Sequence, residues 1–170
     1  MKKLGKRGYQ ILKMCHLFIA GVWVGSAVVV NLLLALLNET NLIKYLEIVL
    51  LVDLAIVIPC AFLCLLTGIL FSVFTNWGFI KHRWIVAKYL VNLFPIITGW
   101  LLHGAQLQGM IRIANELGAD ALMDKTFKEY YYGFFGICIL YIAFFVFVYI
   151  ISVSKPKFGK KNNKLSMLTI

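Results

Sequence analysis

The 170-residue sequence has little charge: only 14% of its residues are Asp, Glu, Lys or Arg, and only 7 of these are acidic. A soluble domain of this length carries a much larger share of charged residues on its surface. Hydrophobic residues instead make up 62% of the chain, and the mean hydropathy is +0.88. The low charge therefore argues against a soluble globular domain, and a lipid bilayer is the expected solvent for most of the chain.

Paired cysteine motifs are also lacking. None of the cysteines belongs to a Cys-x-x-Cys pair, and all four lie in apolar runs: Cys15, Cys60, Cys64 and Cys138. The simplest interpretation is that they are small core residues, although Cys60 and Cys64 share a helix face and leave a soft-metal site open. No small-residue cleavage site follows the first apolar run, which is too long for a signal peptide, so this run is expected to remain as a membrane helix.

Four apolar runs are long enough to cross about 30 Å of hydrocarbon as helices. They predict an all-α polytopic membrane protein, an antiparallel four-helix bundle with helices at about residues 9–37, 43–74, 83–105 and 130–153. The bundle forms one transmembrane domain over residues 1–154, followed by a basic cytoplasmic tail over residues 155–170. The connection over residues 104–129 is predicted to be partly helical. It either continues the third helix or lies on the outer surface.

The net charge of +10 follows the predicted topology. Most of the 17 basic residues lie near the two termini or between the second and third runs, and these segments share one side of a four-span bundle. The positive-inside rule then places both termini in the cytoplasm and the protein in the plasma membrane. The basic excess also favours contact with anionic membrane lipid, and we expect no nucleic-acid partner.

The first run contains an ionisable residue, His16, within the stretch KMCHLFIAGVWVGSAVVVNL. At 100° per residue, the face of His16 also carries small, aromatic and polar side chains, namely Ala20, Trp23, Ala27 and Asn31. Gly21 and Gly25 form a GxxxG pair on the opposite face. This pair is either a chance feature of an apolar helix or a surface where another backbone approaches closely. We expect the helix to have two inward faces.

The third run carries a polar stripe that includes Lys88. Measured as the angle around the helix axis, Asn92, Pro95, Gly99 and Gln106 lie within about 40° of Lys88. His103 lies within about 60° of it. Asp53 lies near the middle of the second run, where it is either neutral or paired with a cation on the third helix. Ionisable residues inside a membrane are costly, so each of them is a functional candidate.

The depth of each residue decides which of them share a site. His16 and Lys88 both lie roughly 7 Å from the cytoplasmic edge, and His82 lies a little further out on the same side. His103 lies near the outer end, about 20 Å or more away along the membrane normal. We therefore expect His16 to share a site with Lys88 or His82, and His103 to belong to a separate outer site.

Two segments resemble a known group of small helical membrane proteins. CHLFIAGVWVG places His16, Trp23 and Gly25 at the spacing typical of the first helix in this group, and RWIVAKYLVNL places an aromatic residue shortly before Lys88. The group includes the bacterial membrane protoporphyrinogen oxidase family and the copper-resistance D-type proteins. The third helix is also similar to that of an uncharacterised family of integral membrane proteins. The resemblance implies that His16 is a haem ligand and that Lys88 is its catalytic partner.

The first hypothesis is a haem b protein with one haem on the cytoplasmic side. Neutral imidazole is a standard axial ligand of haem iron, and four antiparallel helices can hold a macrocycle between them. We expect His16 to bind the iron, with either His82 as the second ligand or a five-coordinate iron. The role would be electron transfer, or oxidation of a porphyrinogen by an oxidoreductase that meets a porphyrin or a redox partner.

The residues around this haem are expected to be small, aromatic or basic. Small side chains on the face of His16 leave room for the ring, and an indole can stack on it. Basic side chains at the cytoplasmic edge bind the propionates. The expected residues are Ala20, Ala27, Trp23, Lys88 and Arg83.

Two other classes of protein stay open. The first is a transporter for copper or for a small solute coupled to protons, with a polar path along the third helix opposite Asp53. The second is an accessory membrane subunit without a cofactor, in which the polar residues only hold helices together. A homodimer is compatible with each of these hypotheses.

Overall fold

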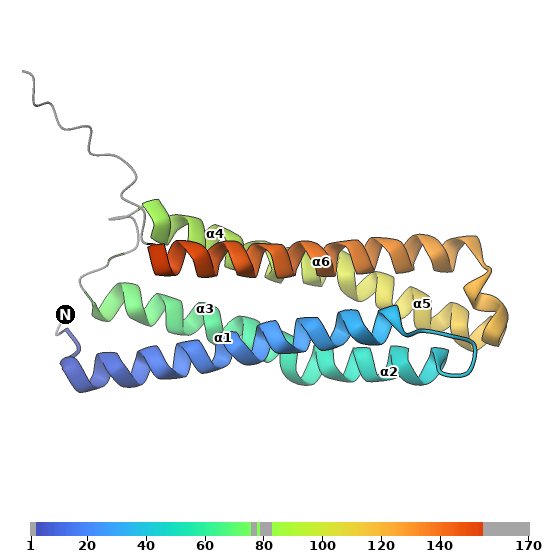
Figure 1. Cartoon of the computed structure of the whole chain (residues 1–170), viewed down its shortest axis with the longest axis horizontal. Helices are drawn as coiled ribbons and strands as arrows, with labels where there is room; N and C mark the ends of the chain where they lie inside the picture. The colour runs from blue at the N-terminus through green and yellow to red at the C-terminus, as the bar shows by residue number, and fades with distance from the viewer. Residues whose placement is uncertain (1–2, 76–77, 79–82, 155–170) are drawn as a thin grey trace, which may run out of the picture.

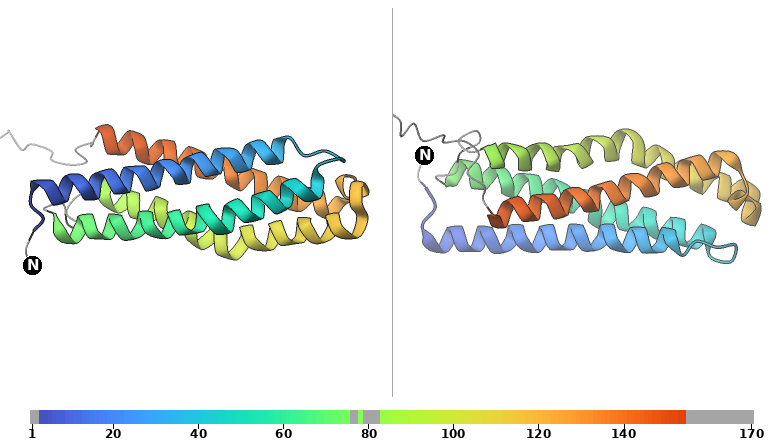
Figure 2. Two further views of the ribbon diagram at one scale, coloured as in Figure 1. Left: turned by 90° about the horizontal axis from the view of Figure 1, so that it is seen from below. Right: turned by 45° about the horizontal axis from the view of Figure 1, so that its top comes forward.

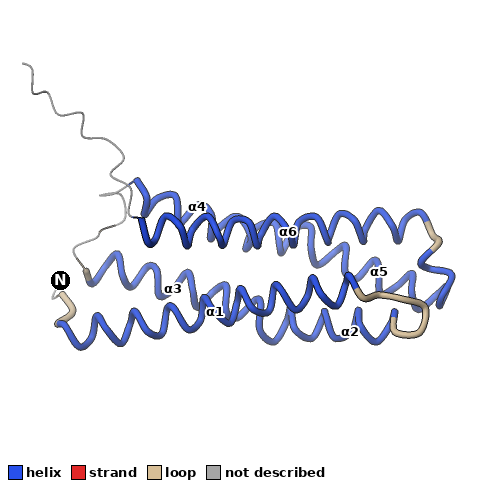
Figure 3. Tube along the Cα trace, viewed as in Figure 1, coloured by secondary structure: helices blue, strands red, loops and turns tan. Residues whose placement is uncertain are grey.

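The computed structural model describes residues 3–75, 78 and 83–154, apart from the side chains of residues 83, 84 and 100. These residues form helices joined by short loops, with no strand among them, and the all-α prediction is confirmed (Figure 3). The elements are α1 (Lys6–Ala35), α2 (Leu42–Val52), η1 (Asp53–Val57), α3 (Ile58–Phe74), α4 (Arg83–Thr98), η2 (Gly99–His103), α5 (Gly104–Leu117), η3 (Gly118–Leu122) and α6 (Lys125–Ser154).

The elements assemble into four rods that lie side by side and alternate in direction (Figures 1 and 2). The rods are α1, the continuous α2–η1–α3, the continuous α4–η2–α5, and α6. Helix α1 packs on α3 and α6, α4 packs on the same two helices, and α2 packs on α5. We call the end of the bundle where α1 begins and α6 ends the termini end, and the opposite end the far end (Figure 1).

Four helices in the described part of the chain are long and apolar enough to cross a membrane: Lys6–Ala35, Leu42–Phe74, Ile85–Leu122 and Lys125–Ser154. Large apolar side chains also face outward along the bundle, and Phe18, for example, is 74% exposed. An exterior of this kind suits lipid rather than water. These properties agree with the prediction of a multi-pass membrane protein.

The buried core is unequally divided along the bundle. Most of the buried apolar residues lie in the far half, including Leu34, Val49, Met110, Phe127 and Phe134. A second, smaller cluster, which we call the Trp23 layer, consists of Trp23, Ala61 and Cys64 with Phe145 packed against the indole. The far half is therefore the densely packed part of the bundle, and the Trp23 layer borders the half nearer the termini.

Two of the rods contain a π-helical segment, η1 in the second rod and η2 in the third. Pro59 follows η1 and lacks an N–H group, and its ring would clash with the carbonyl of Ala55 in a regular α-helix. The wider π turn accommodates that conflict and lets the helix continue. Each segment also turns one ionisable residue of its rod, Asp53 or His103, relative to a regular helix.

The connection predicted over residues 104–129 continues the third rod as α5 and does not form a separate surface helix. Helix α5 packs on α2 and α6 and ends at Gly118, which adopts a positive φ of 59°. Helix α6 begins at Lys125, five residues before the predicted start at 130. The Asp124 carboxylate accepts a hydrogen bond of 2.8 Å from the backbone N–H of Phe127 and so satisfies one open donor of the first turn.

The expected second inward face of α1 is wrong. Gly21 and Gly25 are exposed, and a Cβ atom at either position would meet no other atom within 4 Å. The residues of α1 that the bundle buries all lie on the other side of the helix: Trp23, Ser26, Val30 and Leu34. The GxxxG pair therefore does not bring another helix of this chain close to α1.

Gly25 faces open space and Gly109 faces the Tyr130 ring, so substitutions at these two glycines should have opposite effects. Gly25→Ala should stabilise the protein by about 0.5–1 kcal/mol, because alanine favours the helix and no atom obstructs the new methyl group. Gly109→Ala should instead destabilise it, because the new Cβ would lie 2.5 Å from the Tyr130 ring and overpacking costs about 1–3 kcal/mol. Unfolding in detergent measures both, and equal shifts for the two variants would contradict the packing described here.

Candidate functional site

His16 lies on α1 in the half of the bundle nearer the termini and contacts α3. Its Nδ1 atom is 2.6 Å from the Thr67 Oγ1 atom, and its ring meets the Phe71 ring edge-on with centroids 5.6 Å apart. The imidazole is half-buried, whereas Thr67 is buried. Two side chains of α3 therefore hold the histidine in one orientation.

The hydrogen bonds of Thr67 decide which nitrogen of His16 carries the proton. The Thr67 hydroxyl lies 2.8 Å from the Leu63 carbonyl oxygen and 3.0 Å from the Cys64 carbonyl oxygen. Carbonyl oxygens only accept, so the single hydroxyl proton points to them and the oxygen accepts from His16 Nδ1–H. This tautomer leaves a lone pair on Nε2, which has no hydrogen-bond partner among the described residues.

Lys88 is half-buried on α4, and its ammonium group lies within Coulombic range of the His16 imidazole. The next residue, Tyr89, donates a hydrogen bond of 2.8 Å to the Gly68 carbonyl oxygen and lies 2.7 Å from the Ser72 hydroxyl. These bonds fasten α4 to α3 one and five residues after Thr67. The relation between the predicted pair, His16 on α1 and Lys88 on α4, is therefore electrostatic.

The Trp23 layer closes the bundle on the far side of His16. Trp23 is only 4% exposed, and its ring centroid lies 4.6 Å from that of Phe145. Ala20 packs against this layer from the side of His16. Ala27, one turn beyond Trp23, instead accepts a hydrogen bond from Asn31 through its carbonyl oxygen. Ala20 and Ala27 are both predicted to leave room for the haem macrocycle. Ala20 lies on the same side of the Trp23 layer as His16, and Ala27 lies on the other side.

Two other predicted residues fall outside the description. His82 is outside the described residues, and Arg83 begins α4 with a side chain that is also outside the described part. Cys60 and Cys64, the alternative soft-metal pair, pack in or against the Trp23 layer. In residues 3–75, 78 and 83–154, no three His, Cys, Asp or Glu side chains come together as a set that could hold a metal ion.

His103 belongs to a different polar group in the far half of the bundle. Its Nε2 atom lies 3.4 Å from the Cys138 sulfur on α6. Seven residues further along α6, Phe145 contacts Trp23, which itself lies seven residues after His16 on α1. At 1.5 Å per residue, these two segments separate the two histidines by about 20 Å along the bundle axis. The structure therefore keeps His103 apart from His16.

Asp53 makes no ion pair with a described residue.

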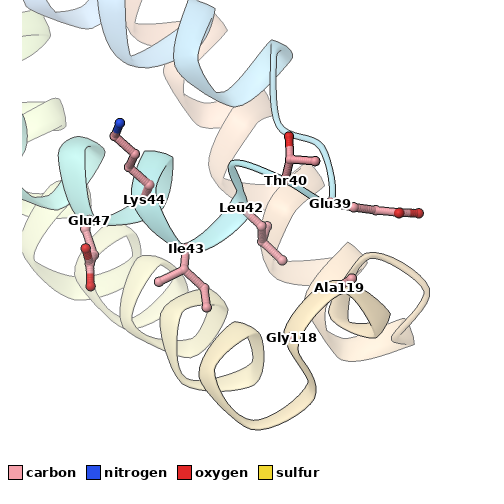
Figure 4. Close-up of a pocket in the computed structure, with 8 residues that line it drawn as sticks. All are labelled: Glu39, Thr40, Leu42, Ile43, Lys44, Glu47, Gly118 and Ala119. Atoms are coloured by element: carbon pink, nitrogen blue, oxygen red, sulfur yellow. The ribbon is translucent and has the colours of Figure 1, made fainter.

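A cavity of about 390 Å³ lies at the far end between the α1–α2 loop and η3 (Figure 4). It is lined by Glu39, Lys44, Glu47 and uncharged neighbours. The charged ends of these three side chains point in different directions, so they do not converge on one ligand position. This cavity is also distant from both histidines.

Thr67 is the partner of His16 that the sequence pattern does not single out. Counted at 100° per residue it shares a helix face with Asp53, and a threonine in an apolar run is a common packing residue. The sequence feature that could have found Thr67 is its depth in the bundle, because Thr67 and His16 lie at similar distances from the termini end of their helices. Phe134 gives no signal at all, because nothing in an aromatic-rich helix indicates which ring stacks on His103.

No protein-family model, no curated protein and no solved structure matches this chain.

Proposed function

We propose that this protein is a haem b-binding integral membrane protein with a role in electron transfer or in the oxidation of a porphyrinogen. One haem would lie in the half of the bundle nearer the termini, with His16 as its axial ligand. The observation that carries this proposal is the hydrogen bond between His16 Nδ1 and Thr67, which leaves Nε2 without a partner among the described residues.

The donor set of this chain fits a haem. An axial histidine is neutral, binds iron through one nitrogen and donates its other N–H to a nearby acceptor that orients the ring. His16 donates its Nδ1–H to Thr67, and its Nε2 atom would be the one to bind the iron. A haem needs only one or two ligands from the protein, so a single well-held imidazole would be sufficient, and His82 would be a possible second ligand.

Lys88 would act on the carboxylates of the bound group. Its charge acts on His16 from α4, and an ammonium group in this position would bind a propionate of the haem or of a porphyrinogen substrate. The Tyr89 hydroxyl anchors this part of α4 to α3 and so holds Lys88 in place. Arg83, one and a half turns earlier on α4, is the second candidate for a propionate.

The haem, when bound, supplies the electron transfer, and the chain supplies position and exclusion of water. The Trp23 layer seals the site from the far half of the bundle. With the basic termini in the cytoplasm, the site would lie in the cytoplasmic half of the plasma membrane. A porphyrin or a redox partner would reach it from that side, and anionic lipid would surround the basic end.

An absorption spectrum tests this function. The full-length protein, purified in detergent from cells supplied with haem, should show a Soret band with about one haem per chain. A colourless protein from such cells would rule out the proposal. If haem is present, activity on protoporphyrinogen separates an oxidase from an electron carrier.

Lys88 should contribute measurably to the affinity for haem. Lys88→Met should weaken haem binding about tenfold or more, because a hydrogen bond to a charged group contributes about 1.5–3 kcal/mol. Lys88→Arg keeps the positive charge and should retain most of the affinity. Titration of the haem-free protein measures both variants, and equal affinities for Lys88→Met and the unaltered protein would show that Lys88 binds no propionate.

A further inference from the structure

His103 and Cys138 place an imidazole nitrogen beside a thiol in the far half of the bundle. The Nε2 atom of His103, the last residue of η2, lies 3.4 Å from the Sγ atom of Cys138 on α6. The two side chains are only 7% and 4% exposed. Imidazole nitrogen and thiolate sulfur are both good ligands for soft metal ions, so this contact joins two metal-binding donors from two different rods.

Aromatic side chains hold the ring of His103 in place. The imidazole stacks on the Phe134 ring, with centroids 3.8 Å apart and planes inclined by 11°. Tyr141 meets it edge-on with centroids 5.4 Å apart, and a hydrogen bond of 2.6 Å to Thr98 fixes Tyr141 in turn. The imidazole therefore has little freedom to turn away from Cys138. Donors that are already in position lose little conformational entropy when they bind an ion.

The spacing of the two donor atoms suits a metal ion. With bonds of about 2.0 Å to imidazole nitrogen and about 2.3 Å to thiolate sulfur, a separation of 3.4 Å corresponds to an angle of roughly 105° at the ion, close to the tetrahedral angle. Nε2 is also 3.4 Å from the Phe134 carbonyl oxygen, beyond the usual range of about 2.7–3.2 Å for an N–H···O hydrogen bond. That oxygen therefore does not compete strongly for the nitrogen.

The charge of the ion decides which metal this pair can hold. Cys138 belongs to the buried apolar cluster of the far half, together with Leu34 and Phe134. A neutral thiol beside a neutral imidazole carries no charge, and a monovalent ion that replaces the thiol proton keeps the pair uncharged. Zn²⁺ or Cu²⁺ bound to the same two donors would leave a net positive charge among apolar side chains, which is costly. Cu(I) is the soft monovalent ion that thiolate ligands select.

We propose that His103 and Cys138 form a Cu(I) site in the far half of the bundle, separate from the haem site. The ion binds to His103 Nε2 and to Cys138 Sγ, and the thiol proton is released to water. The proton of the ring resides on Nδ1, which has no hydrogen-bond partner among the described residues. One monovalent cation replaces another, and no electron is transferred.

The other cysteines lack this arrangement. Cys15 is exposed on α1, and Cys60 and Cys64 pack in or against the Trp23 layer. In the described part of the chain, Cys138 is the cysteine whose sulfur contacts an imidazole. The contact with His103 therefore distinguishes this site from the pair of Cys60 and Cys64, which shares one helix face.

Competition for Cu(I) tests the site. The full-length protein, in detergent with ascorbate and without oxygen, is titrated against the coloured Cu(I) complex of the chelator bicinchoninate. The unaltered protein should withdraw about one Cu(I) per chain more than Cys138→Ser or His103→Gln does. The double variant should lose no more copper than either single variant, because both side chains hold the same ion.

Cys15→Ser is the matched control, because it removes an exposed thiol and should leave the copper content unchanged. Equal copper uptake by the unaltered protein and by either Cys138→Ser or His103→Gln would overturn the proposal and leave the contact as a hydrogen bond only. If these variants do not fold, X-ray absorption at the copper edge of the unaltered protein replaces them. Copper bound by nitrogen and sulfur supports the site, and copper bound by sulfur alone overturns it. The readout is copper, so the outcome is independent of the function proposed for His16.

Discussion

Replacing His16 with alanine should abolish the Soret band of the purified protein. The substitution removes the only described imidazole nitrogen in this half of the bundle that has no partner and carries a lone pair. A haem without its axial protein ligand keeps only its contacts with apolar side chains and with Lys88, which do not hold the iron. We expect a loss of at least tenfold in haem content per chain, measured by absorption at equal protein concentration.

His103→Gln is the matched control for that result. His103 is also buried in the bundle, but it lies about 20 Å further along the axis and contacts Phe134 and Cys138. The control variant should keep its Soret band. A band that survives in His16→Ala but disappears in His103→Gln would move the haem to the far half and contradict the assignment.

Replacing Thr67 with valine should weaken haem binding by about 10- to 100-fold while leaving the iron ligand in place. Valine has nearly the shape of threonine but cannot accept the Nδ1–H of His16, which the hydroxyl now accepts at 2.6 Å. Loss of a partner that orients a metal-binding histidine typically costs that much affinity. Titration of the haem-free protein with haem measures the effect.

Thr67→Ser separates the hydrogen bond from packing. Serine keeps the hydroxyl and removes one methyl group, so its affinity for haem should stay close to that of the unaltered protein. If valine and serine weaken binding equally, the hydroxyl does not orient His16. The tautomer derived from the Leu63 and Cys64 carbonyl oxygens would then be wrong.

The two halves of the bundle differ in how many apolar side chains they bury. Among the described residues, the far half holds most of the buried apolar side chains, whereas the half nearer the termini has Ile85 and Ile151 buried, with the Trp23 layer at its border. A bundle that is densely packed at one end can keep its fold while the other end accommodates a flat ligand. Substitutions at His16 and Thr67 should therefore change ligand binding far more than they change stability.

The membrane-spanning architecture was accessible from the sequence because hydropathy and length alone specify it. Four apolar runs gave four rods, and the predicted starts of the first three lie within three residues of the observed ones. The inward orientation of the His16 face was also predictable, because Trp23 and Asn31 share the face of His16 at helical spacing. The electrostatic effect of Lys88 on His16 is compatible with the comparison of depths.

Other features depend on forces that no sequence pattern displays. The two faces of α1 differ in burial because the neighbouring helices lie on one side, and the glycine spacing alone does not reveal that side. The π-helical segments arise from local conflicts such as the ring of Pro59, and each shifts the register of the residues that follow. The bond between His16 and Thr67 depends on that register, so a count of 100° per residue does not locate it.

Resonance Raman spectroscopy of the reduced protein tests the central claim, which is that His16 binds haem iron through Nε2. Protein from cells grown with ¹⁵N-histidine should show an iron–nitrogen stretching band that shifts relative to the unlabelled protein. The same band should shift in His103→Gln and be missing in His16→Ala. An isotope-sensitive band that remains in His16→Ala would contradict the account.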